Sequence, residues 1–343
     1  MGEILDIASR LGLAAEEAPA PAIAVKGLVK HFGDLCAIAG IDLEVPRGSI
    51  FAILGPNGAG KTTLIRMLAT LTAPDHGSAK VMGHDIVADA QKVRAEIALT
   101  GQFASLDEDL TGKENLILLA RLWGFRGSKA RLRADDLLEA FDLSDAASKQ
   151  VKDYSGGMRR RLDIAASLVV TPSVLFLDEP TTGLDPKARQ EVWRMIRALA
   201  ASGVTILLST QYMEEADQLA ARIAVIDHGR KIAEGTNREL KAAIGTGMLH
   251  VTLADRDRLK EAARMLSEAL GHPVQSSPEG AELSIIAGDA AAANAVIADL
   301  IAAGIEISDF ALGQPSLDTV FFALTGHAAS DGETNDEAED TRS

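Results

Sequence analysis

The hydrophobic pattern of the chain predicts strands and helices in alternation. Apolar runs of strand length occupy residues 23–29, 41–45, 50–54, 97–100, 174–177, 204–209 and 223–227. Helical patterns lie between them, notably over residues 114–123, 132–141, 158–170 and 186–201. Buried strands that alternate with helices are typical of a mostly parallel sheet. We therefore expect an α/β domain over residues 23–245, with a helical insert at about 103–170.

A second, smaller set of elements begins near residue 246. Strand patterns at 248–253, 281–286 and 306–312 enclose helical patterns at 256–270 and 290–303. This order resembles a split βαβ module, so we expect a small accessory α+β domain over residues 246–327. Its apolar residues at 317, 320, 321 and 324 are spaced to share one helix face. Two roles stay open for this domain, support of a dimer and docking to a partner.

The two ends of the chain differ in composition from these domains. Residues 1–22 end in an Ala/Glu/Pro linker, and we expect them to form a flexible leader. Residues 328–343 are polar and acidic, which predicts a disordered acidic tail.

The residues that follow the predicted strand at 50–54 match the phosphate-binding pattern G-x-x-x-x-G-K-[ST]. They are Gly55, Pro56, Asn57, Gly58, Ala59, Gly60, Lys61, Thr62 and Thr63. The glycines allow backbone N–H groups to surround phosphate oxygens, and the start of the next helix adds the positive end of its dipole. Lys61 is placed to reach the outer phosphates, and the Thr62 hydroxyl to ligate Mg²⁺.

Two carboxylates follow another buried strand. Residues 174–177 run directly into Asp178 and Glu179, and open α/β sheets bind ligands at the carboxyl ends of their strands. We expect Asp178 to hold the Mg²⁺ complex and Glu179 to polarise an attacking water. Gln211 follows the strand at 204–209 and is expected at the same edge.

A second anion site is predicted at Ser155, Gly156 and Gly157. Ser155 is placed to cap the helix at 158–170, and the two glycines leave its first N–H groups open. The three arginines at 159–161 bind phosphate or lie on a solvated helix face, and we favour the solvated face. Two anion sites with one acidic pair suggest a head-to-tail homodimer, in which the Ser155 turn of each copy covers the nucleotide of the other.

Composition and charge argue against several classes of function for this chain. The chain has 343 residues and a net charge of −15, from 34 basic and 49 acidic residues. This balance argues against general nucleic-acid binding, which needs a basic surface. The single cysteine, Cys36, excludes an internal disulfide and a four-cysteine zinc site and suggests a reducing compartment. Because no run approaches the roughly 20 apolar residues of a membrane span, a role at a membrane would require a partner that supplies the spans.

These motifs, in this order, resemble the ATP-binding cassette of ABC transporters. The resemblance covers residues 23–240, and the Ser-Gly-Gly signature separates this family from other phosphate-loop proteins. It is carried by residues 55–63, Gln102, 154–158, 174–180 and 183–185. Residues 102–115, 154–170, 209–220 and 315–327 more narrowly resemble the daunorubicin/doxorubicin-resistance type of exporter ATPase.

The resemblance implies that ATP and Mg²⁺ are the ligands, with roles for individual residues. Lys61 would bind the β- and γ-phosphates, Thr62 would bind Mg²⁺, and Glu179 would be the catalytic base. Gln102 would sense Mg²⁺ and the attacking water and couple the site to the membrane partner.

The remaining implied roles concern the dimer and the base. Ser155 and Gly157 would touch the γ-phosphate of the opposite site, and Asp185 would lie at the dimer seam. Phe32 falls where the family has its adenine-stacking aromatic. From its own position, an adenine platform and a loop anchor are equally open for Phe32.

One position departs from the general pattern, because most cassettes carry His where this chain has Gln211. A carboxamide still donates to the γ-phosphate but does not titrate near neutral pH. We therefore expect no loss of ATPase activity through this position between about pH 6 and pH 8. The doxorubicin-resistance type also uses Gln here, so the departure agrees with the narrower resemblance.

The sequence thus predicts the ATP-hydrolysing subunit of an ABC exporter, bound peripherally at the cytoplasmic face of the cell membrane. It would power efflux of a drug-like or hydrophobic compound through a separate integral-membrane permease. Two alternatives stay open: a soluble ABC-type ATPase that acts on nucleic acid or the ribosome, and an ATP-binding regulatory module with little turnover.

Overall fold

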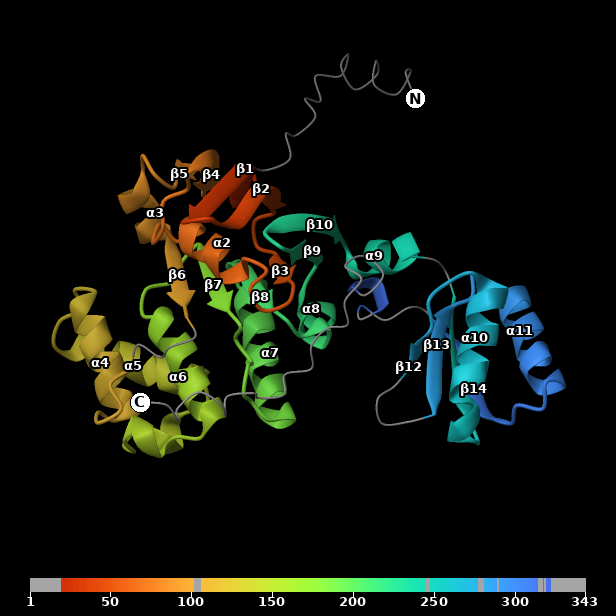
Figure 1. Cartoon of the computed structure of the whole chain (residues 1–343). Helices are drawn as coiled ribbons and strands as arrows, with labels where there is room; N and C mark the ends of the chain where they lie inside the picture. Colours follow the sequence, from red (N-terminus) through yellow and green to blue (C-terminus); the bar gives the residue numbers. More distant parts are fainter. Residues whose placement is uncertain are drawn as a thin grey trace, which may run out of the picture. The chain divides into compact units, whose positions relative to one another are not determined.

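The computed structural model describes residues 20–101, 106–244, 247–276, 281–288, 290–313, 317 and 319–321. The chain divides into two compact units, Met1–Glu234 and Gly235–Ser343 (Figure 1). Each unit mixes helices with a β-sheet and has a hydrophobic core of its own. The predicted fold class, an α/β domain followed by a small α+β domain, is confirmed.

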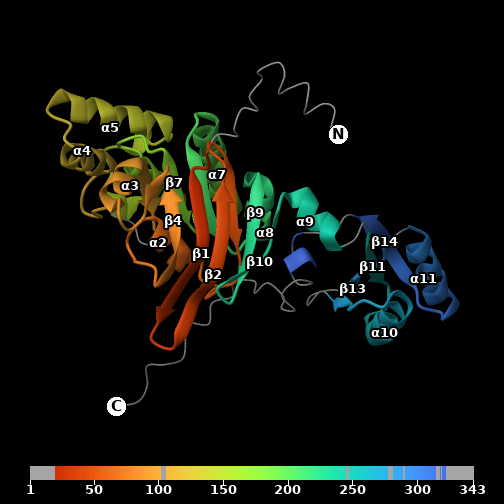
Figure 2. The ribbon, with the colours of Figure 1, turned by 90° about the horizontal axis from the view of Figure 1, so that it is seen from above.

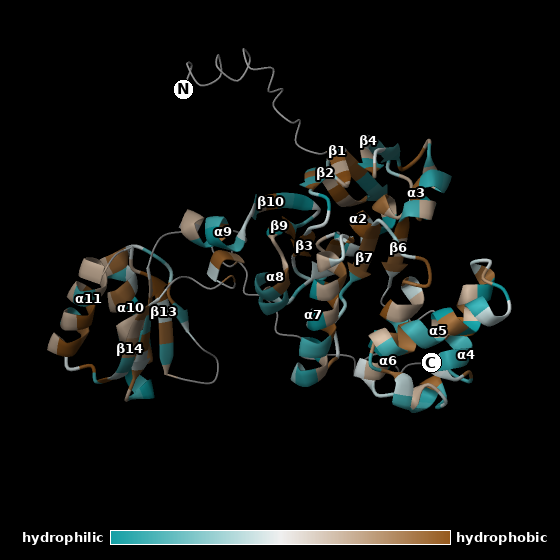
Figure 3. Cartoon of the chain, turned by 180° about the vertical axis from the view of Figure 1, so that it is seen from behind, coloured by the Kyte–Doolittle hydropathy of each residue, from teal (hydrophilic) through white to brown (hydrophobic). Residues whose placement is uncertain are grey.

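The first unit is built on a six-stranded sheet in the order β10-β9-β3-β8-β7-β6. Its strands are β3 (Ile50–Leu54), β6 (Ile97–Thr100), β7 (Val174–Asp178), β8 (Thr205–Thr210), β9 (Arg222–Asp227) and β10 (Arg230–Gly235). Every residue of β3, β7 and β8 is buried, so both faces of these strands are covered. Figure 3 accordingly shows the central strands of this sheet mostly in brown, the hydrophobic end of its scale.

The register of the parallel strands brings their carboxyl ends together. Strand β8 lies between β3 and β7 and runs parallel to both. Leu54 pairs with Thr210, and Asp178 pairs with Ser209. The segments that follow β3, β7 and β8 therefore start at one edge of the sheet. The helices that follow are α2 (Lys61–Leu68), α7 (Pro186–Ala201) and α8 (Met213–Leu219).

A second sheet of the first unit is antiparallel, in the order β2-β1-β4-β5. It contains β1 (Ile23–Phe32), β2 (Leu35–Val45), β4 (His76–Val81) and β5 (His84–Asp85), with α3 (Ala90–Glu96) after it. The sequence predicts shorter strands, at 23–29 and 41–45. In the structure the two pair as one long hairpin as far as Phe32 and Leu35 (Figure 2). Register shifts on either side of Leu28 absorb the break in the hydrophobic pattern.

The helical part lies between β6 and β7. It comprises α4 (Gly112–Leu122), α5 (Ser128–Ala140), the 3₁₀ turns η1 (Ser144–Ala146) and η2 (Val151–Asp153), and α6 (Gly156–Ser167). Both amphipathic helices predicted at 114–123 and 132–141 are present, and each starts earlier than predicted. Helix α4 starts earlier because Thr111 and Glu114 form a capping box ahead of it.

The second unit has a four-stranded sheet in the order β12-β13-β11-β14. Its elements are α9 (Asn237–Ile244), β11 (Met248–Leu253), η3 (Arg256–Arg258), α10 (Leu259–Leu270), β12 (Gln275–Ser276), β13 (Glu282–Ile286), α11 (Ala290–Ala302) and β14 (Ile307–Gly313). Helices α10 and α11 share a core with β11 and β13. Of the predicted apolar helix face, Leu317, Val320 and Phe321 are buried, and residue 324 lies outside the described residues.

Two boundaries differ from those expected. The second unit begins at Gly235, ahead of the predicted boundary at 245/246. Helix α9, which the hydrophobic pattern does not predict, follows β10 because Thr236 and Glu239 bond each other's backbone N–H groups at its start. Ala22, placed in the leader by the sequence, is fully buried and exchanges backbone hydrogen bonds with Val45 and Met82.

Within the described residues, no helix combines the length and the apolar character needed to span a membrane.

Candidate active site

The phosphate-loop residues connect β3 to α2 with little free space. A side chain at Gly55 would place its Cβ 2.2 Å from the Ile226 carbonyl oxygen, and one at Gly60 would lie 2.5 Å from that of Ala37. Gly60 caps α2 with a φ of 103°, a conformation that suits glycine. The loop therefore requires glycine at these two positions, as its sequence pattern predicts.

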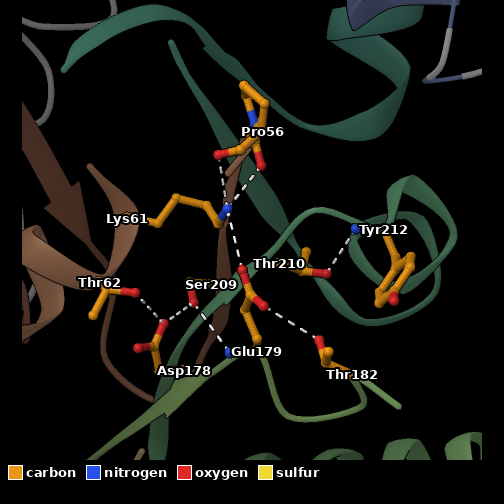
Figure 4. A network of polar contacts seen from close by, with 10 residues as sticks. Pro56, Lys61, Thr62, Asp178, Glu179, Thr182, Ser209, Thr210 and Tyr212 are labelled. Carbon is orange, nitrogen blue, oxygen red and sulfur yellow. Dashed lines mark hydrogen bonds and ion pairs between the residues drawn. The ribbon is translucent and has the colours of Figure 1, made fainter. Parts of the chain in front are cut away.

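Lys61 is almost completely buried beneath this loop. Its ammonium donates to the carbonyl oxygens of Gly55 at 2.9 Å and Pro56 at 3.0 Å, and lies 3.3 Å from Glu179 Oε1 (Figure 4). Burial lowers the pKa of Lys61, and the nearby carboxylates of Glu179 and Asp178 oppose that shift. A bound polyphosphate would supply further negative charge to this ammonium, so the site fits an anionic ligand.

Asp178 and Thr62 meet at the end of β7. The Thr62 hydroxyl donates to Asp178 Oδ1 at 3.1 Å, and the Ser209 hydroxyl donates to the same oxygen (Figure 4). Only 4% of Asp178 is exposed. A hydroxyl and a carboxylate beside the phosphate loop are hard oxygen ligands of the kind that Mg²⁺ prefers. These residues therefore fit a magnesium ion.

Glu179 has a strained backbone that is held from several sides. Its φ is 47°, in the left-handed region that non-glycine residues rarely adopt. Its N–H lies 3.1 Å from both the carbonyl and the hydroxyl oxygens of Ser209. The Thr182 hydroxyl donates to Glu179 Oε2 at 3.3 Å, while Oε1 faces Lys61. These contacts direct the carboxylate toward the phosphate loop.

A pocket of about 420 Å³ joins this loop to the β1–β2 hairpin. Its lining includes Phe32, Asn57, Lys61, Thr62 and Glu179. The Phe32 ring is half exposed at the end of the hairpin, and the Lys30 ammonium lies 5.4 Å from its centroid. The structure thus brings Phe32 into the same pocket as the phosphate loop, an arrangement compatible with stacking on a base.

The Ser155 turn forms a separate part of the site. Ser155 is exposed, and its hydroxyl accepts from Met158 N at 3.2 Å, so it caps α6 as predicted. Gly157 packs so closely that an added Cβ would lie 2.7 Å from Ala188 Cβ. Asp185 caps α7 by accepting from Ala188 N at 3.0 Å. Among the described residues, the lining of the 420 Å³ pocket includes none of this turn.

The two glutamines differ in how far they can be placed. Gln211 follows β8 directly and is half buried, so it starts at the same sheet edge as Asp178. Gln102 lies outside the described residues, and its predicted role stays a prediction. Gly101, just before it, accepts a hydrogen bond from Arg160 at 3.0 Å.

Several residues at the site were not predicted from the sequence. Ser209 bonds both carboxylate residues, and His228 lines the pocket from the β9–β10 turn. Glu215 on α8 is fully buried and accepts from Thr181 at 2.8 Å and Trp193 at 3.0 Å. Only Ser209 carried a usable signal, its place at the end of a buried strand.

Because the Glu215 carboxyl is buried, we expect the Glu215→Gln variant to gain stability in a pH-dependent way. Burial raises the pKa of Glu215 above its ordinary 4.5, and hydrogen bonds from Thr210, Thr181 and Trp193 and the charge of Arg189 oppose the shift. Below that ordinary value the carboxyl is protonated in both states. Above it, the unfolded chain releases the proton more readily, so the wild-type protein loses stability as pH rises through the folded pKa.

The variant should therefore gain stability relative to the wild type between about pH 4.5 and neutrality. Chemical denaturation of both proteins at several pH values measures this difference, with the effects of other titrating groups common to both. A stability difference that is constant, or that shrinks as pH rises, would contradict the expectation.

Comparisons with known proteins assign the chain to a family. A family described as ABC transporter matches residues 38–182, and one described as "ATP-binding protein DrrA1-3-like, C-terminal domain" matches residues 235–325. The daunorubicin/doxorubicin resistance ATP-binding protein DrrA of Streptomyces peucetius is 52% identical over 324 residues, which cover 94% of this chain and 98% of the relative. The chain belongs to this family of ABC transporter ATP-binding proteins.

Other relatives of this ABC ATPase extend the comparison. A doxorubicin resistance ATP-binding protein of Mycobacterium tuberculosis is 45% identical, over 89% of this chain and 93% of the relative. The Nod factor export ATP-binding protein I of Ralstonia nicotianae is 44% identical, over 72% of this chain and 78% of the relative. The resemblance drawn from the motifs is confirmed, and the exporter interpretation is supported over its two alternatives.

Solved structures agree with this assignment. The cbiO1 protein of Clostridium perfringens, part of an ABC transporter complex, matches with a TM-score of 0.61 at 26% identity, over 74% of this chain and 96% of that one. A dimeric ATP-binding cassette in a post-hydrolysis state with ADP and Pi matches with a TM-score of 0.57 at 25% identity, over 62% of this chain and 98% of that one. The chain is an ABC-type ATP hydrolase that binds ATP with Mg²⁺, and ATP-binding subunits of this family work with a membrane permease.

Proposed function

We propose that this ABC ATPase powers the export of a drug-like, hydrophobic compound of the daunorubicin type through a separate integral-membrane permease. The observation that carries the proposal is the 52% identity to a daunorubicin/doxorubicin resistance protein, over nearly the full length of both chains. Since the permease would supply the membrane spans, the chain would act at the cytoplasmic face of the membrane as a peripheral subunit.

The geometry supports a division of roles between the loop and the two carboxylates. Lys61 would bind the β- and γ-phosphates, within a loop of backbone N–H groups. Thr62 and Asp178, with Gln102, would hold Mg²⁺, which neutralises charge on the phosphate oxygens when bound. Glu179 would accept a proton from the attacking water, because its carboxylate faces Lys61 and is oriented by Thr182.

Further nucleotide contacts follow from the loop and the pocket. Phe32 would stack on the adenine from the end of the β1–β2 hairpin, since it lines the same pocket as Lys61. Gln211 would donate to the γ-phosphate from the end of β8. The loop residues proposed to surround the phosphates are Gly55, Pro56, Asn57, Gly58, Ala59, Gly60 and Thr63.

Two copies of the chain are proposed to complete each site. The Ser155 turn, with Gly156 and Gly157, offers the N–H groups at the start of α6, and Ser155 and Asp185 are both exposed. Gly157 packs against Ala188, whose N–H donates to Asp185. The turn would cover the γ-phosphate bound to the other copy, with Asp185 at the seam. The match to a dimeric cassette with ADP and Pi supports this arrangement.

Drug export is tested by producing the chain in a drug-sensitive host together with the membrane protein that co-purifies with it from native membranes. Cells should accumulate less daunorubicin, measured by its fluorescence, than cells with the permease alone. The Lys61→Ala variant should remove this difference, because the ammonium would no longer bind the outer phosphates.

A matched control is Lys129→Ala, a lysine exposed on α5, which should leave efflux unchanged. If the wild-type pair hydrolyses ATP but its cells accumulate as much daunorubicin as cells with the permease alone, the proposed class of exported compound is wrong. Stimulation of its ATPase by another compound would then identify the class to test.

A further inference from the structure

The three consecutive arginines of α6 turn to three different parts of the first unit. Arg159 pairs with the exposed Glu108 at 2.9 Å. Arg161 donates at 3.3 Å to the carbonyl oxygens of Phe141 and Asp142, at the end of α5. Both Arg160 and Arg161 are only 13% exposed. The solvated helix face favoured by the sequence is therefore wrong for these two side chains, and Arg160 points toward the strand ends.

Arg160 makes four hydrogen bonds at the edge of the sheet. Its guanidinium donates to the carbonyl oxygens of Pro180 at 2.8 Å, Gly101 at 3.0 Å and Asp178 at 3.3 Å, and to Asp163 Oδ2 at 3.2 Å. A planar group with fixed donor directions holds several carbonyls in one geometry, which a lysine cannot do. One side chain of α6 thus fixes the backbone on either side of Glu179.

Glu215 holds the same segment from the opposite helix. It comes from α8, just after Gln211, and its Oε1 accepts from the hydroxyl of Thr181 and the indole of Trp193. Both Thr181 and Glu215 have no exposed surface. Adjacent residues, Pro180 and Thr181, are therefore each bonded to a buried ionisable side chain, one from α6 and one from α8.

The held segment controls the direction of the proposed base. Glu179 has its left-handed φ immediately before Pro180, and such a conformation persists only where the surroundings over-determine it. Its N–H is fixed by Ser209 on one side, so the peptide that follows sets the rest of the geometry. Release of that peptide would allow the carboxylate to turn from the phosphate loop.

We propose that Arg160 and Glu215 form a clamp on Pro180 and Thr181 that positions Glu179 for water activation. Both are positioning residues, because they act through Glu179. None of their hydrogen bonds described above is to a residue of the phosphate loop. The clamp also joins the segment that follows β7 to α6, which Ser155 caps, and to α8, which follows Gln211. The inference rests on the proposed catalytic role of Glu179.

The first test compares steady-state ATPase kinetics of Arg160→Met with those of Arg159→Met. Arg160→Met should lower kcat at least about tenfold, a fraction of the effect of a lost general base, and should leave the affinity for a fluorescent ATP analogue within about threefold. Arg160→Lys should restore only part of kcat, since an ammonium does not span three carbonyls. The matched variant Arg159→Met, on the same turn, should retain wild-type kcat.

An unchanged kcat in Arg160→Met, with wild-type protein active, would overturn the clamp while the proposed function stood. If the wild type itself shows no turnover, the proposed function fails instead. Should Arg160→Met not fold, Arg160→Lys and Thr181→Val, which removes the hydroxyl that donates to Glu215, decide by the same kcat criterion. The double variant of those two substitutions should lose no more kcat than the worse single variant, because both release one segment. Losses that multiply would show that the two residues act separately.

Discussion

The Glu179→Gln variant should bind ATP and fail to hydrolyse it. The carboxamide keeps the size of the side chain but cannot accept the proton of the attacking water, and loss of a general base lowers rates by about 100-fold to 10,000-fold. Phosphate release by the purified chain with its permease should therefore fall at least about 100-fold. Loss of the carboxylate also removes a negative charge 3.3 Å from the Lys61 ammonium, so affinity for the nucleotide should rise or stay unchanged.

Equilibrium binding of a fluorescent ATP analogue and phosphate release, measured on the same preparation, separate these two effects. Glu139→Gln, at an exposed position on α5, is the matched control and should retain wild-type turnover. Turnover within about threefold of the wild type in Glu179→Gln would exclude Glu179 as the base. Another group would then have to take the proton, and the clamp proposed for Arg160 and Glu215 would lose its purpose.

Much of this site could be predicted from the sequence because its parts are local in the chain. The phosphate loop combines a strand, a turn of fixed glycine spacing and a helix start, and each is visible within a few residues. Asp178 and Glu179 could be predicted because they follow a buried parallel strand, and ligands bind at the carboxyl ends of such strands. The pairing of Asp178 with Ser209 in the structure agrees with that argument.

The missed features depend on contacts between segments far apart in the sequence. The strand predicted at 23–29 stopped short of Phe32 because Lys30 and His31 interrupt the apolar pattern, but the β1–β2 pairing continues through both. The arginines of α6 were predicted to lie on a solvated helix face, because the sequence does not reveal which buried backbone carbonyls lie near a charged side chain. Arg160 bonds residues on either side of it in the chain, and their positions follow only from the folded sheet.

Glu215 illustrates the same difficulty from the opposite side. Helix α8 begins with two acidic residues, Glu214 and Glu215, a pattern that normally indicates an exposed helix start. Glu214 is exposed as expected, yet Glu215 is buried under Trp193 and Thr181. Only the packing of α7 against α8 separates the two. A sequence pattern therefore located the chemistry but not the residues that hold it in place.

The proposed sharing of each site between two copies of the chain predicts that two inactive variants should restore nucleotide binding when they are paired. One copy carries Lys61→Ala, which removes the ammonium from the site on its own phosphate loop. The other copy carries Ser155→Arg, which blocks the cap that this copy offers to that same site. In a mixed dimer both defects fall in one site. The second site then combines Lys61 of one copy with Ser155 of the other, and both are intact.

This is measured with two differently tagged copies, each carrying Glu179→Gln to slow turnover, purified through both tags in sequence. The mixed dimer should retain one ATP after rapid desalting, and dimers of either variant alone should retain about none, because every site in them lacks the lysine or the cap. A pair without the Lys61 and Ser155 substitutions provides the reference of two. If the mixed dimer also retains none while the reference retains two, each chain uses its own Ser155, and the arrangement of shared sites is wrong.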